Sequence, residues 1–98
     1  MIINEIRNGD SMTVALEGRL DYTGAPELQE MLNKNLPAIS ALILDFEKVD
    51  YVSSIGLRVL LSAKKKLQDR GNVRILNANR LVMEVFKVTG MIDLFTFE

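Results

Sequence analysis

Residues 39–61, ISALILDFEKVDYVSSIGLRVLL, form the stretch that decides the fold. The apolar run Leu42-Ile43-Leu44 predicts a buried strand, covered by helices on both faces or closely packed by them, and a short acidic connection follows it. Ser53 and Ser54 then precede an apolar helix, as expected because a serine oxygen accepts the backbone N–H bonds that a helix start leaves unpaired. The stretch therefore predicts a strand–helix unit.

The residues before this stretch predict a hairpin and a first helix. Residues 2–6 begin a short strand, Asn8-Gly9 indicates a tight turn, and residues 12–17 alternate as a returning strand. Residues 22–27 carry a helix-start signature, and apolar side chains then recur at helical spacing until Pro37. An antiparallel pair at the N-terminus is the consequence.

The residues after the stretch complete an alternating pattern. We expect a helix from about Ile55 to Arg70 with Gly71 as its breaker, a strand over Val73–Leu76, a third helix over residues 81–90 and a closing strand over Leu94–Phe97. The order β-β-α-β-α-β-α-β predicts an α/β fold. Its sheet is mixed, with an N-terminal antiparallel hairpin, parallel βα units and helices packed on the sheet.

Length and composition bound the class of protein. The 98 residues suit one domain spanning 1–98, and 48% hydrophobic with 26% charged residues is ordinary for a globular chain. A net charge of −1 argues against nucleic acid or an anionic membrane as a partner. No signal peptide or membrane-spanning stretch is visible, so we expect a cytoplasmic protein that is a monomer when free.

Two residue types are missing, and their absence disfavours an enzyme. The chain has no cysteine and no histidine, which removes the thiol nucleophile, the commonest general base and the commonest transition-metal ligands. Asp21, Asp45 and Asp50 suggest an acidic pocket, but no strand ends in the lysine that a receiver-type site needs. We therefore expect no catalytic residue, no metal and no cofactor.

The serine pair offers a chemistry of its own. A phosphate on Ser54 or Ser53 would lie beside unpaired N–H groups and the positive end of the helix dipole. An apolar surface adjoins it, so the segment suits a phosphorylation switch. The simpler interpretation is that Ser54 only caps the helix, and the two interpretations are compatible.

Three segments together resemble a known family. They are Gly18-Arg19-Leu20-Asp21, Leu42-Ile43-Leu44-Asp45 and residues 51–61, YVSSIGLRVLL. The chain resembles the STAS domain over its whole length and, more narrowly, the bacterial anti-sigma-factor antagonists. The resemblance implies a non-enzymatic regulator whose unmodified form binds a serine kinase that is also an anti-sigma factor, which frees a sigma factor. Phosphorylation then breaks the complex, and a metal-dependent serine phosphatase resets it.

The resemblance also assigns candidate residues. The family's acceptor lies two residues before the glycine, which is Ser54 here. Many members have Asp at the preceding position, where this chain has Ser53, so Ser53 offers a second hydroxyl and is the reserve candidate. The loop that begins at Asp21 is implied to lie beside the serines. The predicted contact zone for the partner comprises Asp21, Tyr22, Thr23, Ser53, Ile55, Gly56, Arg58, Val59 and Ser62.

Helical spacing adds detail to this zone. Arg58, Ser62, Lys65, Lys66 and Asp69 fall on one outward stripe, which is ordinarily a solvated face. Ile55 and Val59 flank the stripe and pack in the core unless they form an exposed apolar pair beside Ser54. The competing functional hypothesis is a STAS module that senses a small anion or nucleotide, or that scaffolds a complex, without being phosphorylated.

Overall fold

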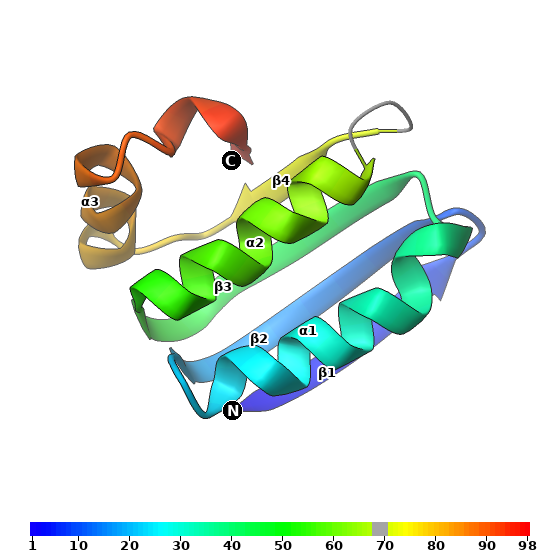
Figure 1. Cartoon of the computed structure of the whole chain (residues 1–98), viewed down its shortest axis with the longest axis horizontal. Coiled ribbons are helices and arrows are strands. Elements are labelled where there is room, and N and C mark those ends of the chain that lie inside the picture. Colours follow the sequence, from blue (N-terminus) through cyan, green and yellow to red (C-terminus); the bar gives the residue numbers. More distant parts are fainter. Residues whose placement is uncertain (68–70) are drawn as a thin grey trace.

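The fold is one five-stranded sheet with helices against it. The computed structural model describes residues 1–67 and 71–98. The sheet order is β1-β2-β3-β4-β5, in which β1 and β2 are antiparallel and every other neighbouring pair is parallel (Figure 1). The strands are β1 (Ile2–Asn8), β2 (Ser11–Leu20), β3 (Ala41–Val52), β4 (Val73–Leu76) and β5 (Thr96–Phe97). The predicted α/β fold with a mixed sheet is confirmed.

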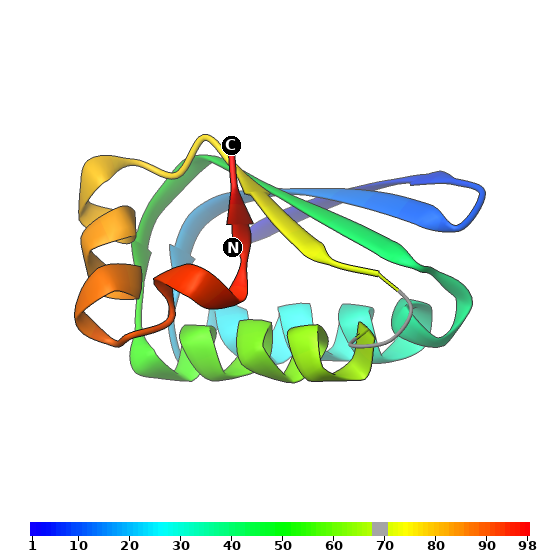
Figure 2. The ribbon, with the colours of Figure 1, turned by 90° about the horizontal axis from the view of Figure 1, so that it is seen from above.

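The two longest helices lie on the same face of the sheet. α1 (Gly24–Asn35) and α2 (Ser54–Leu67) run side by side beneath the strands, whereas α3 (Arg80–Val88) stands at one end of the sheet (Figure 2). Two short 3-10 segments, Leu36–Ala38 and Ile92–Leu94, follow α1 and α3. The opposite face of the sheet carries no helix among the described residues (Figure 2).

The N-terminal hairpin forms as predicted, with its turn one residue later. Asn8 is still a strand residue opposite Ser11, and the loop consists of Gly9 and Asp10. Gly9 has φ of 62°, a backbone region that glycine enters without strain.

The acidic connection predicted after Leu44 is wrong, because β3 continues to Val52. Its second half pairs with β2 from Glu17↔Lys48 to Leu20↔Val52, and the register shifts between Ala15 and Glu17 and between Gly18 and Arg19, each time by one extra residue in β3. These shifts interrupt the alternation of buried and exposed side chains that is typical of a strand. The polar residues of this segment therefore have the sequence pattern of a loop. The longer β3 carries the chain directly to the serines.

Coverage of β3 by helices on both faces is also wrong. Leu42, Leu44 and Phe46 are fully buried beneath the helices, whereas Ile43 is only partly buried on the opposite face. The three-residue apolar run is therefore compatible with a strand that is packed by helices on one side only.

The remaining elements follow the prediction, with shorter ends. α2 is described to Leu67, and the predicted continuation to Arg70 lies outside the described residues. At the C-terminus only Thr96 and Phe97 form strand, because Leu94 ends a 3-10 turn. The rings of Phe95 and Phe97 pack edge-on against Phe86 of α3, at centroid distances of 5.6 and 5.0 Å, and this aromatic cluster fixes the C-terminal segment.

A core substitution tests this architecture. Phe46 is fully buried in β3, so Phe46→Ala should lower the free energy of unfolding by about 3–5 kcal/mol through lost burial and a residual cavity. Glu47→Ala, one exposed position further along β3, is the control and should change it by less than about 0.5 kcal/mol. Denaturant unfolding of both variants measures the difference, and equal effects would contradict the one-sided burial of β3.

Candidate functional site

The start of α2 is held against the end of β2 by Ser53. Its backbone N–H donates to the carbonyl oxygen of Leu20 at 3.0 Å, and its hydroxyl donates to the same oxygen at 3.2 Å. The Ser53 Oγ also accepts the Gly56 N–H at 3.4 Å, the geometry of a helix N-cap. The capping role considered for Ser54 therefore belongs to Ser53, which is only partly exposed.

Gly56 is buried because the helix start and β2 approach each other closely. A Cβ atom at this position would lie 2.6 Å from the Leu20 carbonyl oxygen and 2.8 Å from Leu20 Cγ. Any larger residue would push the first turn of α2 away from the sheet. The glycine is thus explained by packing, and its side of the helix is not available for the direct partner contact that the sequence suggested.

Ser54 is the first residue of α2 and is exposed. No hydrogen bond joins its hydroxyl to another residue of the described part of the chain. The neighbouring N–H groups of the first turn have no intrahelical carbonyl to bind, since they precede the first helical repeat. The structure therefore presents a reachable hydroxyl beside backbone donors, with the capping task already performed by the preceding residue.

Asp21 organises the adjoining loop. Its Oδ1 accepts the Thr23 N–H at 3.0 Å, the Thr23 hydroxyl at 2.7 Å and the Gly24 N–H at 3.4 Å, while Arg19 lies 3.5 Å from Oδ2. The hydrogen bonds from Thr23 lower the pKa of the Asp21 carboxyl most, and those from Gly24 and Arg19 lower it further. Asp21 thus fixes the turn that starts α1 and is not free to bind a partner with this oxygen.

The loop lies beside the serines, as the resemblance implied. Leu20, which immediately precedes Asp21, is the residue that accepts the Ser53 hydrogen bonds. Tyr22 and Thr23 are exposed next to it, Tyr22 with 75% of its surface accessible. Adjacent parallel strands end at the same edge of a sheet, which brings the two loops together.

The predicted contact zone contains both exposed and buried residues. Ile55 and Arg58 are exposed and Ser62 is half-buried, so all three reach the surface of α2. Val59 is only 7% exposed and belongs to the core. The exposed apolar pair proposed from helical spacing is therefore wrong for Val59, because α1 packs over that side of α2.

Two shallow apolar grooves flank the first turns of α2, and Arg58 borders both. One lies toward α1 and is lined by Ala25, Pro26, Gln29, Ile55, Arg58 and Val59. The other is lined by Ser54, Leu57, Arg58, Leu61, Thr89 and Met91. Pro26, Gln29, Thr89 and Met91 were not foreseen, because only tertiary packing brings the first helix and the end of α3 to this place.

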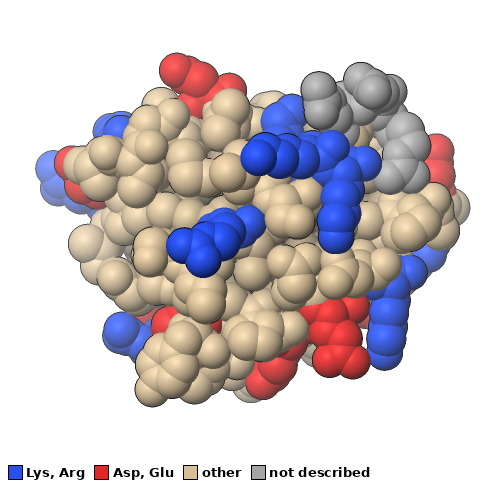
Figure 3. Space-filling view, viewed as in Figure 1, with Lys and Arg blue, Asp and Glu red and all other residues tan. Residues whose placement is uncertain are grey.

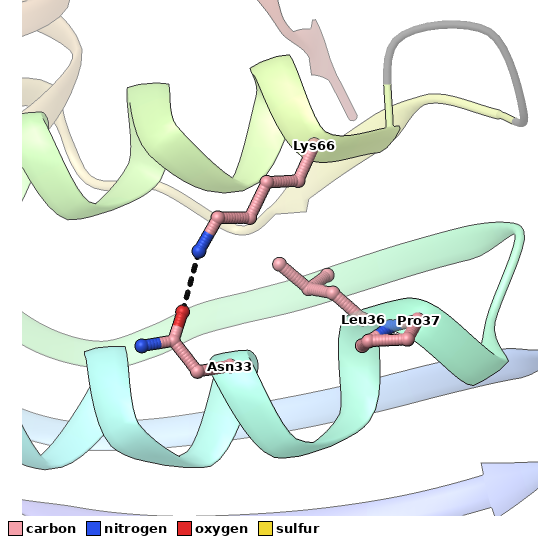
Figure 4. A pocket seen from close by; sticks show the side chains of 4 residues that line it. All are labelled: Asn33, Leu36, Pro37 and Lys66. Carbon is pink, nitrogen blue, oxygen red and sulfur yellow. Dashed lines mark hydrogen bonds between the residues drawn. The ribbon is translucent and has the colours of Figure 1, made fainter.

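The exposed charge on α2 is basic. Arg58, Lys65 and Lys66 are exposed, and the described part of the helix contains no acidic residue. Figure 3 shows basic side chains gathered over this helix. Asp69 of the predicted stripe lies outside the described residues. Farther along, the Lys66 ammonium donates to Asn33 Oδ1 at 2.6 Å and bridges the two helices beside Leu36 and Pro37 (Figure 4).

The sequence matches the STAS domain over residues 2–98. The chain belongs to the STAS domain family. Within it, the chain is 33% identical to a putative anti-sigma factor antagonist, BtrV, of Bordetella bronchiseptica over 89 residues, which cover 88% of this chain and 77% of the relative. It is 30% identical to the anti-sigma-B factor antagonist of Staphylococcus epidermidis over 94 residues, covering 94% of this chain and 87% of the relative. These STAS relatives are regulatory proteins and not enzymes.

Solved STAS structures share the fold. The anti-sigma factor antagonist SpoIIAA in its unphosphorylated form superposes with a TM-score of 0.88 at 19% identity, covering 99% of this chain and 88% of that one. The phosphorylated form from Bacillus gives 0.79 at 18% identity, covering 99% and 91%. The STAS fold identified from the sequence is therefore confirmed, with the serines at the start of its second helix.

The described residues contain neither a metal-binding cluster nor a membrane-spanning helix. In residues 1–67 and 71–98, no group of three or more acidic side chains could hold a metal ion. None of the helices described is both long and apolar enough to span a bilayer.

Ser53 and Gly56 have structural roles that Ser54 does not share, and the free energies of unfolding of variants test this difference. Ser53→Ala should lower the free energy of unfolding by about 1–2 kcal/mol through the lost cap, and Gly56→Ala by about 1–3 kcal/mol through overlap with Leu20. Ser54→Ala, the matched control, should change it by less than about 0.5 kcal/mol. Urea unfolding measures all three, and a Ser54→Ala loss equal to that of Ser53→Ala would contradict the assignment of the cap.

The depressed pKa of Asp21 predicts a pH dependence. Because this carboxyl has a lower pKa in the fold than its ordinary 3.8, it stabilises the native state above that pH, and the contribution is lost as the pH falls through the folded value. Asp21→Asn should therefore be less stable than the parent at neutral pH, with a difference that shrinks in acid. Unfolding curves over a pH series, with NMR titration of the carboxyl carbon, measure this, and a difference that grows in acid would contradict it.

Proposed function

We propose that this STAS protein is an anti-sigma factor antagonist whose partner binding is switched by phosphorylation of Ser54. The unmodified chain binds a serine kinase that serves as an anti-sigma factor, and a metal-dependent serine phosphatase restores it after modification. The observation that carries this proposal is the exposed Ser54 hydroxyl at the start of α2, which lines one apolar groove and precedes Ile55, a lining residue of the other. The names of the relatives support the same class of partner.

Ser54 is favoured over Ser53 as the acceptor by its surroundings. A kinase must reach the hydroxyl, and Ser54 is exposed whereas Ser53 is partly covered and engaged with Leu20. Phosphorylation of Ser53 would also remove the hydroxyl hydrogen that Leu20 accepts and would crowd the Ser53 Oγ contact to the Gly56 N–H. Modification of Ser54 leaves both in place, so the phosphorylated chain can stay folded.

The chain itself tolerates the phosphate better than a docked partner does. The group brings about −1.5 to −2 charges, and the helix dipole and free N–H groups of the first turn favour an anion there. A partner seated on the same surface would have to desolvate that charge without a matching cation. A hundredfold loss of affinity needs only about 2.8 kcal/mol, and burial of an unpaired charge can exceed this.

The exposed residues around Ser54 support a proposed contact surface. One rim of this surface consists of Tyr22 and Thr23. Its centre is the exposed apolar side chain of Ile55, and the surface continues along α2 through Arg58 and Ser62. Aromatic, apolar and arginine side chains are the usual anchors of protein interfaces. We infer that Tyr22, Ile55 and Arg58 contribute most of the binding free energy.

Substitutions at Ser54 test the switch. With the cognate kinase, Ser54→Ala should bind like the parent and acquire no phosphate, whereas Ser54→Asp should bind at least about tenfold more weakly. Calorimetry measures the affinity, and mass spectrometry after incubation with ATP locates the phosphate. Asn72→Asp adds a negative charge at an exposed position before β4, at the opposite end of the sheet, and is the control for a general charge effect; it should bind like the parent.

Two results would contradict the proposal. The first is a Ser54→Asp variant that binds the kinase as tightly as the parent, which would remove the charge as the cause. The second is phosphate found only on Ser53, which would reverse the assignment of the acceptor. Stabilisation of the chain by a free anion or nucleotide without any modification would favour the sensing function instead.

A further inference from the structure

β1 is an edge strand with an unusual surface. No strand in the described part of the chain pairs with its outer edge, because β1 ends the sheet order. Ile2 and Ile6 are nevertheless 55% and 64% exposed on it. An exposed edge of this length with apolar side chains is a template for further strand pairing.

The side chains of β1 separate into two rows. Ile3, Glu5 and Arg7 are opposite Leu16, Val14 and Met12, whose side chains are buried beneath the helices. Directly opposed residues of an antiparallel pair point to the same face. The second row, Ile2, Asn4, Ile6 and Asn8, therefore lies on the face of the sheet that has no helix.

The hairpin determines which backbone groups of β1 face outward. In a hairpin with a two-residue loop, the flanking pair is hydrogen-bonded, which here is Asn8↔Ser11. Hydrogen-bonded and non-hydrogen-bonded pairs then alternate along the ladder, so Ile6 and Asn4 also bond to β2. The N–H and C=O groups of Ile3, Glu5 and Arg7 consequently point away from the sheet.

We propose that two copies of this chain associate through antiparallel pairing of β1 with β1, with Ile6 of one copy opposite Ile6 of the other. In this register Glu5 of each copy is opposite Arg7 of the second copy, so two oppositely charged pairs form on the helix face. Asn4 is opposite Asn8 of the second copy on the other face. Opposite-charge and β-branched cross-strand pairs are both favourable.

Other symmetric registers of β1 against β1 pair the side chains less favourably. Centring on Glu5 would place two Glu5 carboxylates directly opposite each other, which is destabilising. Centring on Asn4 would place the charged Glu5 opposite the apolar Ile3. The register centred on Ile6 is the one in which charges and apolar side chains both match, so the edge is complementary to a second copy of itself.

The pairing is compatible with the rest of the molecule. The Arg7 guanidinium donates from Nε to the carbonyl oxygen of Gly9 at 2.9 Å and from Nη2 to that of Ala38 at 3.0 Å, which leaves Nη1 to pair with Glu5 of the second copy. Ile6 lies in the half of β1 nearer the hairpin turn, and β2 and β3 separate β1 from β4 in the sheet. The pairing surface includes no residue of α2, so it does not involve the Ser54 site.

A single added strand pair predicts a weak dimer in place of the monomer expected from the sequence. Isolated strand pairs are marginally stable, so we expect a dissociation constant on the order of 100 µM. Sedimentation velocity of the purified chain from about 10 µM to 1 mM should therefore show a rising sedimentation coefficient. A single monomer boundary throughout would overturn the proposal and leave the edge to a strand of another protein.

Cysteine cross-linking tests the register, because the chain has no cysteine of its own. Residues opposite each other in a non-hydrogen-bonded pair have Cα atoms about 4.5 Å apart, within the range of a disulfide. Ile6→Cys should therefore form a covalent dimer under mild oxidation at least about tenfold faster than Lys87→Cys, an exposed control on α3. Preferential cross-linking of Asn4→Cys would overturn the register, and equal rates at all three positions would overturn the pairing.

Charge exchange tests the two cross-strand pairs. Glu5→Arg should weaken the dimer by about tenfold, since it puts like charges opposite each other twice. The double variant Glu5→Arg with Arg7→Glu should restore the parent's dissociation constant, provided that thermal melting shows both variants folded. A double variant as weak as the single one would overturn the role of these pairs.

Discussion

The close approach of β2 to α2 at Leu20 is the constraint on which the site depends. One carbonyl oxygen accepts both the N–H and the hydroxyl of Ser53, and the absence of a Cβ at Gly56 lets the helix come that near. Because Asp21 follows Leu20 directly, the same contact brings the loop of Tyr22 and Thr23 beside the serines. A short stretch of backbone packing thus creates the exposed surface and holds Ser54 at its edge.

The sequence predicted the structure best where local interactions determine it, as at helix starts and ends. It predicted least where tertiary packing determines which residues are buried or brought together. Helical spacing and Pro37 located α1, and the serine pair before an apolar run identified the start of α2. The polar residues of β3 were misinterpreted, because register shifts against β2 interrupt the period-two pattern. Val59 was wrongly included in the contact zone because α1 covers it, and Met91 was missed because only the packing of the segment after α3 brings it to α2.

The arrangement explains how a switch can operate without a conformational change. Ser53 carries the structural task of capping, which leaves Ser54 free to change its charge without unfolding the helix. The helix start tolerates an anion, whereas an interface that covers it must desolvate that anion. In the proposed switch, the difference in affinity arises at the contact surface itself. The proposed pairing of β1 uses an edge strand that has no residue in this surface.

The most direct test of this account is a comparison of amide chemical shifts between the unmodified and the Ser54-phosphorylated chain. The account predicts shift changes confined to the first turn of α2, the loop after Leu20 and the residues lining the adjoining grooves, with the amides of β1, β4 and the end of α1 unchanged. Changes that extend through the buried strands would mean that phosphorylation rearranges the fold, and would contradict a switch that acts by surface charge alone.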